Sequence, residues 1–452
     1  MPNKIGNDTP SIKDAQQFKN TFNTIQQLIK EDKIVAGHDV ASGGLITTLL
    51  EMCFADVNLG AELDLTELAE KDSVKLLFAE NSGIVFQATD NSVEQVLTNA
   101  NIEFFNIGKV TNSDVLSIIN HQEVFTLTVS RLRDVWYKTS FLLDQKQTAN
   151  NLAQDRFDNY KKQPLQYKFP KHFTGKLSDV IASETKQSDS EKEIAMSRAP
   201  RKDRPKAAIL REKGSNSERE MANAMYLAGF DVKDVHMTDL ISGRETLEDI
   251  QFIGAVGGFS NSDVLGSAKG WAGAFMYNEK ANTALKNFFK REDTLSVGIC
   301  NGCQLFMELE VINPEHDVHG KMTYNDSHKH ESAFTSVKIQ KNNSVMLSTL
   351  EGTTLGVWIS HGEGKFSLPK SEDQYHIVAK YGYEEYPANP NGSDYNTAMM
   401  CDKTGRHLVT MPHIERSTFQ WNWANYPDNR KDEVSPWLEA FVNARKWLEN
   451  KK

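Results

Sequence analysis

One stretch limits what this chain can fold into more than any other. An apolar run over residues 295–299 ends in Cys300, and a helix-like run over 304–309 follows. Strand, tight elbow and helix, in that order, is the arrangement that holds a nucleophile clear of a sheet. Gly298 and Gly302 allow such an elbow to turn without a Cβ clash. A helix N-terminus behind the sulfur favours the negatively charged form of a cysteine, which is the reactive form.

The same stretch has other interpretations. Cys300 and Cys303 have the Cys-x-x-Cys spacing of a redox pair or of half a zinc site. The remaining cysteines, Cys53 and Cys401, do not form a second such pair, which disfavours a four-cysteine zinc site. Taken alone, the stretch also leaves open a buried structural cysteine.

Composition narrows the class of protein. The 452 residues are enough for two or three domains. A net charge of −10 without a basic stripe predicts no nucleic-acid partner. No apolar run approaches the length that crosses a bilayer, so no membrane partner is expected. Four cysteines without a signal peptide favour a reducing compartment, and we expect a cytoplasmic protein.

Residues 10–150 mix helix and strand signals, which predicts an α+β domain. We expect helices over 15–31, 46–54, 92–100 and 132–150, and strands over 34–37, 83–88, 104–110 and 124–129. Asp39 and the pair Gly43-Gly44 lie between a strand and a helix. This pattern presents backbone amides to a phosphate, beside a carboxylate that can hold a cation. A simple tight turn is the alternative.

A polar, charged stretch over 151–205 is interpreted as an interdomain linker. An alternating pattern begins at residue 206, with strands over 207–210, 232–236, 252–256 and 295–299 and helices over 217–227 and 281–290. Such alternation predicts a parallel sheet that binds ligands at the carboxyl ends of its strands. Further strands are expected over 355–360, 376–381 and 407–410, with a final helix over 436–450.

A catalytic cysteine needs a base, and the base needs a group that orients it. His413 follows the strand over 407–410, and Glu415 is two residues on. Residues two apart in an extended chain point the same way, so Glu415 is placed to hold the His413 ring. Gly257-Gly258, at another strand end, can offer backbone N–H groups to an oxyanion. A surface loop is the alternative for His413 and Glu415.

At this point the sequence resembles a known family. Residues 298–304, Gly-Ile-Cys-Asn-Gly-Cys-Gln, resemble the Gly-x-Cys-x-Gly-x-Gln signature of class I glutamine amidotransferases. Residues 206–452 resemble the glutaminase domain of the phosphoribosylformylglycinamidine synthase family, in the stretches 211–217, 234–240, 257–260, 263–266, 270–272 and 361–364. Residues 10–145 resemble the last synthase-side domain of that family, at 37–39, 43–45 and 132–136.

The resemblance implies a flavodoxin-like, mostly parallel sheet, preceded by an α+β domain like the C-terminal domain of aminoimidazole ribonucleotide synthase. It makes Cys300 the nucleophile that forms a glutamyl thioester, His413 the base and Glu415 its partner. The oxyanion and glutamine-binding residues that it implies are Gly257, Gly258, Phe259, Gln304 and His361. It also implies a nucleotide-phosphate turn at Gly43 and Gly44, and Asp39 as a magnesium ligand.

The implied activity is a glutamine-dependent ligase reaction of de novo purine biosynthesis. Ammonia released from glutamine would serve the ATP- and Mg²⁺-dependent conversion of formylglycinamide ribonucleotide (FGAR) to its amidine, so the small-molecule partners are glutamine, FGAR and ATP. Long-form family members carry much more synthase sequence, and we expect that portion as a partner in cis or in trans. The alternatives are a regulatory or assembly subunit that retains the fold, a cysteine hydrolase on a related α/β fold with no link to a synthase, and a Cys300–Cys303 redox module.

Three positions depart from the family pattern. Ile414 stands where proline is common between the histidine and the glutamate, which leaves both catalytic residues in place. Asn261-Ser262 replaces a common Tyr-Gly after the Phe-Ser of the oxyanion turn, and Ala41-Ser42 replaces a Ser-Asp before Gly43. The last change removes a side chain that could contact a phosphate there.

Overall fold

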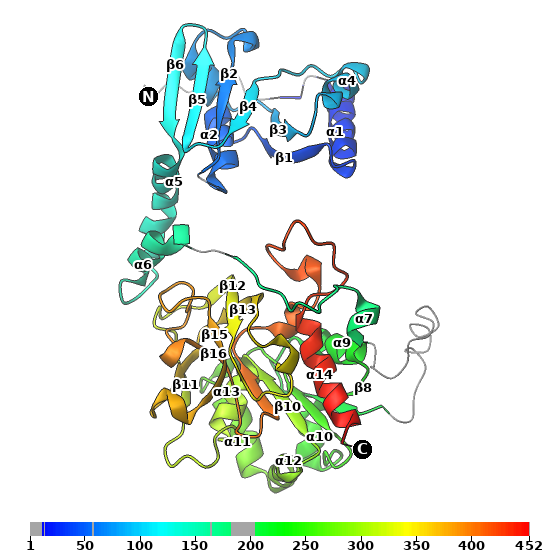
Figure 1. Ribbon diagram of the computed structural model, residues 1–452. Helices are drawn as coiled ribbons and strands as arrows, with labels where there is room; N and C mark the ends of the chain where they lie inside the picture. The colour runs from blue at the N-terminus through cyan, green and yellow to red at the C-terminus, as the bar shows by residue number, and fades with distance from the viewer. Residues whose placement is uncertain (1–10, 13, 57, 163–164, 182–203, 452) are drawn as a thin grey trace. The chain divides into compact units, whose positions relative to one another are not determined.

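A computed structural model describes residues 11–12, 14–56, 58–162, 165–181 and 204–451 (Figure 1). The chain divides into two compact units, Met1–Leu142 and Leu143–Lys452. Within the described ranges, every helix is too short or too polar to cross a bilayer.

The first unit combines two small sheets with helices. Its strands are β1 (Ile34–Asp39), β2 (Gly60–Asp64), β3 (Ile84–Ala88), β4 (Gly108–Thr111), β5 (Val115–Asn120) and β6 (Glu123–Thr128). Strand β1 pairs with β3, while the other four form a mixed sheet in the order β4-β2-β5-β6. The helices are α1 (Ala15–Lys30), α2 (Gly44–Phe54), α3 (Ser73–Phe78), α4 (Ser92–Asn99) and α5 (Val129–Asp144). The predicted α+β class is confirmed.

A nine-stranded sheet dominates the described part of the second unit (Figure 1). In spatial order its strands are β13 (Thr354–His361), β12 (Glu331–Ile339), β15 (His376–Tyr381), β16 (Thr397–Cys401), β17 (His407–Thr410), β10 (Leu295–Ile299), β9 (Phe252–Ala255), β7 (Lys206–Arg211) and β8 (Asp231–His236). The strands from β17 to β8 are parallel, and the pairs from β17 to β13 are antiparallel. The predicted α/β class is confirmed. The sheet as a whole is mixed, with four parallel and four antiparallel strand pairs, so it is parallel only in the half that carries the candidate site.

Helices cover both faces of this sheet. They are α9 (Glu218–Ala228), α10 (Met237–Ser242), α11 (Lys269–Tyr277), α12 (Glu279–Lys290), α13 (Asn301–Glu308) and α14 (Trp437–Glu449). Gly254 of β9 packs against Met221 and Met225 of α9, and the next residue, Ala255, contacts Gly302 of α13. Because neighbouring strand residues point to opposite faces, α9 and α13 lie on opposite sides of the sheet.

The linker interpretation of residues 151–205 needs correction. Phe173 and Val180 are buried in the same core as the large sheet, and α6 (Leu152–Asn159) and α7 (Leu177–Ile181) belong to the second unit. The ring of Phe169 packs 5.7 Å from that of Trp423. These apolar residues have no helical or strand periodicity, so their burial left no pattern in the sequence. Residues 182–203, which include the most polar part of the predicted linker, lie outside the described residues.

Candidate active site

Cys300 occupies a strained position between β10 and α13. It is the residue before the first turn of α13, with φ 53° and ψ −107°, which is unusual for a residue with a side chain. Its backbone N–H donates to the Thr410 carbonyl at 2.8 Å, which continues the ladder between β10 and β17. Its thiol lies 3.5 Å from the Ser360 carbonyl oxygen, Sγ to O. The structure therefore places the sulfur on an elbow at the carboxyl end of the sheet.

The two glycines around Cys300 serve close packing. A Cβ on Gly298 would overlap the carbonyl oxygen of Gly302, and a Cβ on Gly302 would overlap the carbonyl oxygen of Ala255. Neither glycine is among the residues with positive φ, whereas Cys300 is. The turn is therefore strained at the cysteine itself, and the glycines allow α13 to lie directly against the sheet.

His413 and Glu415 form a buried pair just beyond β17. The His413 Nδ1 atom lies 2.7 Å from Glu415 Oε1, and the two side chains are 3% and 0% exposed. The His413 N–H donates to the Trp358 carbonyl at 2.8 Å. Glu415 lies in a short 3₁₀ turn, Ile414–Arg416, so the pair forms through this turn instead of the extended chain that the sequence suggested. Since Glu415 engages Nδ1, the other ring nitrogen is left for a reaction partner.

Gly257 borders both reactive side chains. A Cβ at this position would lie 2.9 Å from Cε1 of His413 and 3.4 Å from Cβ of Cys300. Cys300, His413, Glu415 and the Gly257-Gly258 strand end are therefore brought together at one edge of the sheet, where β9, β10 and β17 end.

The electrostatics of this buried group favour a charged histidine. Burial alone would lower the pKa of His413, but the Glu415 carboxylate and the Cys300 sulfur together raise it to about 10. Burial would likewise raise the pKa of Glu415, but the neighbouring His413 charge lowers it. The pair is therefore an imidazolium and a carboxylate at neutral pH, with a proton available beside the sulfur.

The turn after β9 is held from two sides. The Gly257 carbonyl accepts from the Asn216 N–H at 2.8 Å, and the Phe259 N–H donates to the Gly214 carbonyl at 2.9 Å. Gly258 has φ 113°, which a side chain would disfavour. Because the Phe259 N–H already has a partner, it is not free for an oxyanion in this conformation. The N–H of Asn301, the first residue of α13, is a further donor position that the local sequence pattern did not indicate.

Gln304 and His361 lie near the site but are engaged within the protein. Gln304 is 5% exposed; its Oε1 accepts from Asn301 Nδ2 and its Nε2 donates to the Glu363 carbonyl, both at 2.7 Å. Its amide thus braces the elbow against the 361–364 stretch. Burial lowers the pKa of His361 to about 3, and the charges of His413 and His330 act in the same direction, so its ring is neutral.

The candidate phosphate and magnesium residues lie in the first unit. Gly43 and Gly44 have φ of 88° and 74° and open α2, as the sequence suggested. The Gly43 N–H, however, donates to the Glu80 carboxylate at 2.8 Å, so an acidic group stands where a phosphate would be needed. The Asp39 side chain is 78% exposed, and the described residues include no cluster of three acidic, histidine or cysteine side chains. In this arrangement the Gly43 turn does not fit a phosphate.

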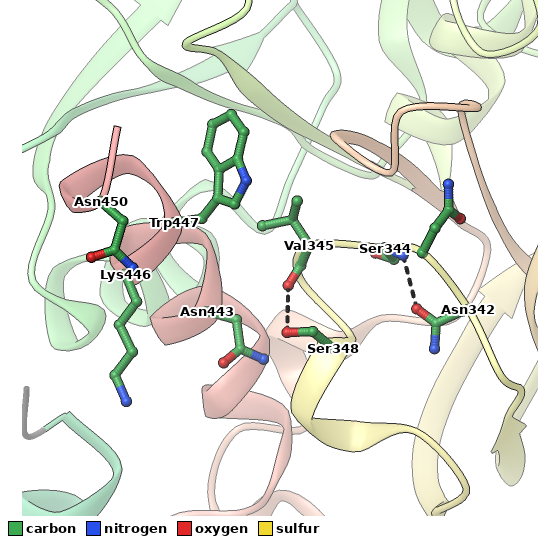
Figure 2. A pocket seen from close by; sticks show the side chains of 9 residues that line it. Asn342, Ser344, Val345, Ser348, Asn443, Lys446, Trp447 and Asn450 are labelled. Atoms are coloured by element: carbon green, nitrogen blue, oxygen red, sulfur yellow. Dashed lines mark hydrogen bonds between the residues drawn. The ribbon is translucent and has the colours of Figure 1, made fainter. Parts of the chain in front are cut away.

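A hollow of about 430 Å³ lies elsewhere on the second unit (Figure 2). It is lined by Asn342, Asn343, Ser344, Val345, Ser348, Asn443, Lys446, Trp447 and Asn450. Residues 342–348 belong to the connection between β12 and β13. Since Glu331 pairs with His361 at one end of these strands and Lys338 with Thr354 at the other, this connection lies at the end of the hairpin away from His361. The predicted site residues therefore do not line it.

Comparison with known protein families shows the class of protein to which the chain belongs. The family of CobB/CobQ-like glutamine amidotransferase domains matches residues 204–448, more than half of the chain, and the chain belongs to this family. The C-terminal domain of AIR synthase related proteins matches residues 3–120. The family that the sequence resembled is thus confirmed.

The particular relatives are phosphoribosylformylglycinamidine synthases. The chain is 38% identical to "Probable phosphoribosylformylglycinamidine synthase, chloroplastic/mitochondrial" of Arabidopsis thaliana, over 99% of this chain and 32% of that protein. It is 35% identical to "Phosphoribosylformylglycinamidine synthase" of Homo sapiens, over 98% of this chain and 34% of that protein. A solved chain of PurLQS from Thermotoga maritima is 23% identical over 54% of this chain and 99% of that chain, with a TM-score of 0.43. The chain spans about a third of the length of these curated relatives.

Proposed function

We propose that this chain is the glutaminase part of a phosphoribosylformylglycinamidine synthase, together with one synthase-side domain. The observation that carries the proposal is the buried His413–Glu415 pair beside Cys300, with both reactive side chains bordering Gly257. The amidotransferase family match and the synthase relatives support the same assignment.

The first half-reaction breaks the amide bond of glutamine. The Cys300 thiolate attacks the side-chain carboxamide carbon, and backbone N–H groups at the elbow and the Gly257–Gly258 turn stabilise the oxyanion. His413, held by Glu415, transfers its Nε2 proton to the nitrogen as the C–N bond breaks. Ammonia leaves, and a γ-glutamyl thioester remains on Cys300.

The second half-reaction restores the cysteine. His413 is now neutral and accepts a proton from water, which attacks the thioester carbon. The C–S bond breaks, glutamate leaves, and Cys300 and His413 return to the thiolate and the imidazolium. Two proton transfers through one ring explain why Glu415 must hold that ring in a fixed orientation.

The released ammonia would serve the ATP-dependent amidation of FGAR in purine biosynthesis, on synthase sequence beyond this chain. Mg²⁺ and ATP belong to that proposed partner reaction, where they would activate the FGAR amide oxygen as a leaving group. No step in it is assigned to Asp39, Gly43 or Gly44, because the Gly43 N–H already donates a hydrogen bond to the Glu80 carboxylate.

The test is glutamate release from glutamine by the purified chain, compared with Cys300→Ala. Cys53→Ala in the first unit is the matched control and should retain activity, since Cys53 lies outside the site. Release by the parent and by Cys53→Ala, but not by Cys300→Ala, supports the proposal.

Without release by the parent, a glutamine analogue with a diazoketone group decides the outcome. Covalent labelling of Cys300 by this probe would show a competent site that needs the rest of the synthase for turnover. Absence of both release and labelling would contradict the glutaminase assignment and favour a regulatory or assembly subunit.

A further inference from the structure

One charged side chain beside the buried pair has no part in the steps above. Arg416 directly follows Glu415, and its Nε lies 3.9 Å from Glu415 Oε1. Its Nη2 donates to the Asn216 Oδ1 atom at 2.8 Å, although Asn216 lies 200 positions away in the sequence. The side chain is 33% exposed, but its Nε atom is buried and has no hydrogen-bond partner among the described residues, so the nearby Glu415 carboxylate is what faces it. Arg416 therefore contacts two segments that meet only in the folded chain.

Asn216 in turn holds the candidate oxyanion turn. Its backbone N–H donates to the Gly257 carbonyl at 2.8 Å, and its neighbour Ser215 forms an antiparallel bridge with Gly258. The contact is close, because a Cβ on Gly258 would lie 2.6 Å from both the Asn216 nitrogen and the Ser215 Cα. Residues 214–216 thus clamp the turn against which Cys300 and His413 pack.

Arginine suits this place chemically. Its planar guanidinium presents several N–H donors in a fixed fork, so one side chain can face a carboxylate and an amide oxygen together. A lysine ammonium on a flexible stem does not fix that geometry. The Glu415 Oε2 atom is buried without a hydrogen-bond partner among the described residues, which makes nearby positive charge valuable. The contact with Glu220, whose side chain is 45% exposed and whose Oε1 lies 3.8 Å from Arg416 Nε, contributes little because solvent screens that carboxylate.

We propose that Arg416 is a positioning residue that, through its contact with Asn216, keeps the His413–Glu415 pair and the Gly257–Phe259 turn at a fixed distance and orientation to each other. The role rests on the proposed glutaminase function. The turn must meet the oxyanion while the histidine meets the leaving nitrogen, so the two must keep their relative positions. A shift of about 1 Å at such a site costs on the order of 100-fold in rate.

The experiment measures kcat and KM for glutamate release by the full chain. Arg416→Gln should lower kcat by roughly 100-fold, with a much smaller change in KM, because the geometry of reaction is lost and not the glutamine contacts. Asn216→Ala should lower kcat by a similar factor. The double variant should be no slower than the slower single variant, since both changes break the same contact between Arg416 and Asn216, which is called the bridge below.

Matched variants distinguish loss of the Arg416–Asn216 contact from loss of a positive charge and from loss of the fold. Asn216→Asp keeps an acceptor for Arg416 and should retain most of the activity. Arg219→Gln removes the same charge from an exposed position on the first turn of α9 and should behave like the parent. Equal unfolding midpoints for the Asn216 variants, at an exposed loop position, would show that the fold is intact.

Several results would overturn the bridge. Full recovery of kcat in Arg416→Lys would show that charge alone suffices. Multiplicative effects of Arg416→Gln and Asn216→Ala would show two independent roles, and parent-like kcat in both would show none.

The glutaminase proposal is tested separately with the diazoketone glutamine analogue. If the parent is labelled at Cys300 but does not turn over, the labelling rate replaces kcat, and the same ranking of variants is expected. A parent that neither turns over nor is labelled overturns the glutaminase proposal, and the bridge with it. Labelling of the parent and equally fast labelling of Arg416→Gln overturns the bridge alone.

Discussion

At the scale of single residues, the His413–Glu415 pair makes stability depend on pH. The His413 pKa is raised to about 10, above its ordinary value of about 6.5. A raised pKa contributes stability that is fully present below about pH 6.5 and is lost as pH rises through about 10. Glu415→Gln removes the charge that raises it. The loss in free energy of unfolding should therefore be largest near pH 6, on the order of 3–5 kcal/mol for a broken buried pair, and should shrink toward pH 10.

Urea unfolding of parent and variant at pH 6, 8 and 10 measures this difference. Glu292→Gln, a charge removal at an exposed position, should show no such pH dependence relative to the parent. A Glu415→Gln difference that stays constant from pH 6 to pH 10 would contradict the coupling between the two side chains.

The sequence located part of the site at this scale. Cys300, His413 and Glu415 were found because each lies in a short local pattern, a strand end followed by a turn, and the structure brings the three together. The stretch 211–217, which contains Asn216, was singled out by the family resemblance, but its contact with Arg416 was not found because it joins positions 200 residues apart. The sequence also did not show that both ends of the Gln304 side-chain amide form hydrogen bonds within the protein, one of them to the distant Glu363 carbonyl.

At the scale of elements, the packing of α13 against β9 depends on Gly302. A Cβ there would overlap the Ala255 backbone oxygen, which cannot move without shifting the sheet. We expect Gly302→Ala to destabilise the protein by about 1–3 kcal/mol through overpacking. The variant should also be labelled more slowly at Cys300 by the diazoketone probe, because α13 carries the elbow.

Gly273→Ala is the matched control for this prediction. Gly273 lies within α11, and a Cβ there would meet only Tyr277 ring atoms at 3.8 Å or more. Alanine is the better helix former, so stability should stay equal or rise by about 0.5–1 kcal/mol. If both variants lowered the urea midpoint equally, the close approach of α13 to β9 would not be the cause.

The strands in the parallel half of the large sheet were easier to predict from the sequence than those in the antiparallel half. Strands β7, β9 and β10 are short apolar runs between helices, buried along most of their length, and the sequence located them. Strand β12 was missed because it alternates buried and exposed residues irregularly, in the pattern Glu-Ser-Ala-Phe-Thr-Ser-Val-Lys-Ile. Antiparallel pairing with β13 and β15, and not local composition, makes this segment a strand.

At the scale of the whole molecule, the amidotransferase unit extends further toward the N-terminus than the resemblance at residue 206 suggested. The rings of Tyr167 and Phe169 pack 5.0 Å and 5.7 Å from that of Trp423. Leu177 N–H donates to Glu433 Oε2 at 2.8 Å, and Lys168 pairs with Thr354 as an isolated bridge. The segment over 165–181 is therefore part of the folded unit.

This boundary predicts the behaviour of shortened chains. A chain of residues 143–452 should unfold cooperatively in urea, since it contains the complete second unit. A chain of residues 204–452 should have a lower urea midpoint and expose an aromatic surface that binds a hydrophobic dye, because Trp423 and Tyr426 lose Phe169 as a ring partner.

Phe169→Ala in the longer chain isolates the packing contribution from the change in length. Removing a half-buried aromatic side chain that contacts Trp423, Tyr426 and the Arg430 guanidinium should cost about 1–3 kcal/mol. Equal midpoints for 143–452 and 204–452 would place the boundary at residue 204 after all. The alternative outcome is a lower midpoint for 204–452 that Phe169→Ala partly reproduces in the longer chain. It would show that buried aromatic side chains hold the segment over 165–181 in the unit, although this segment has no periodic pattern in the sequence.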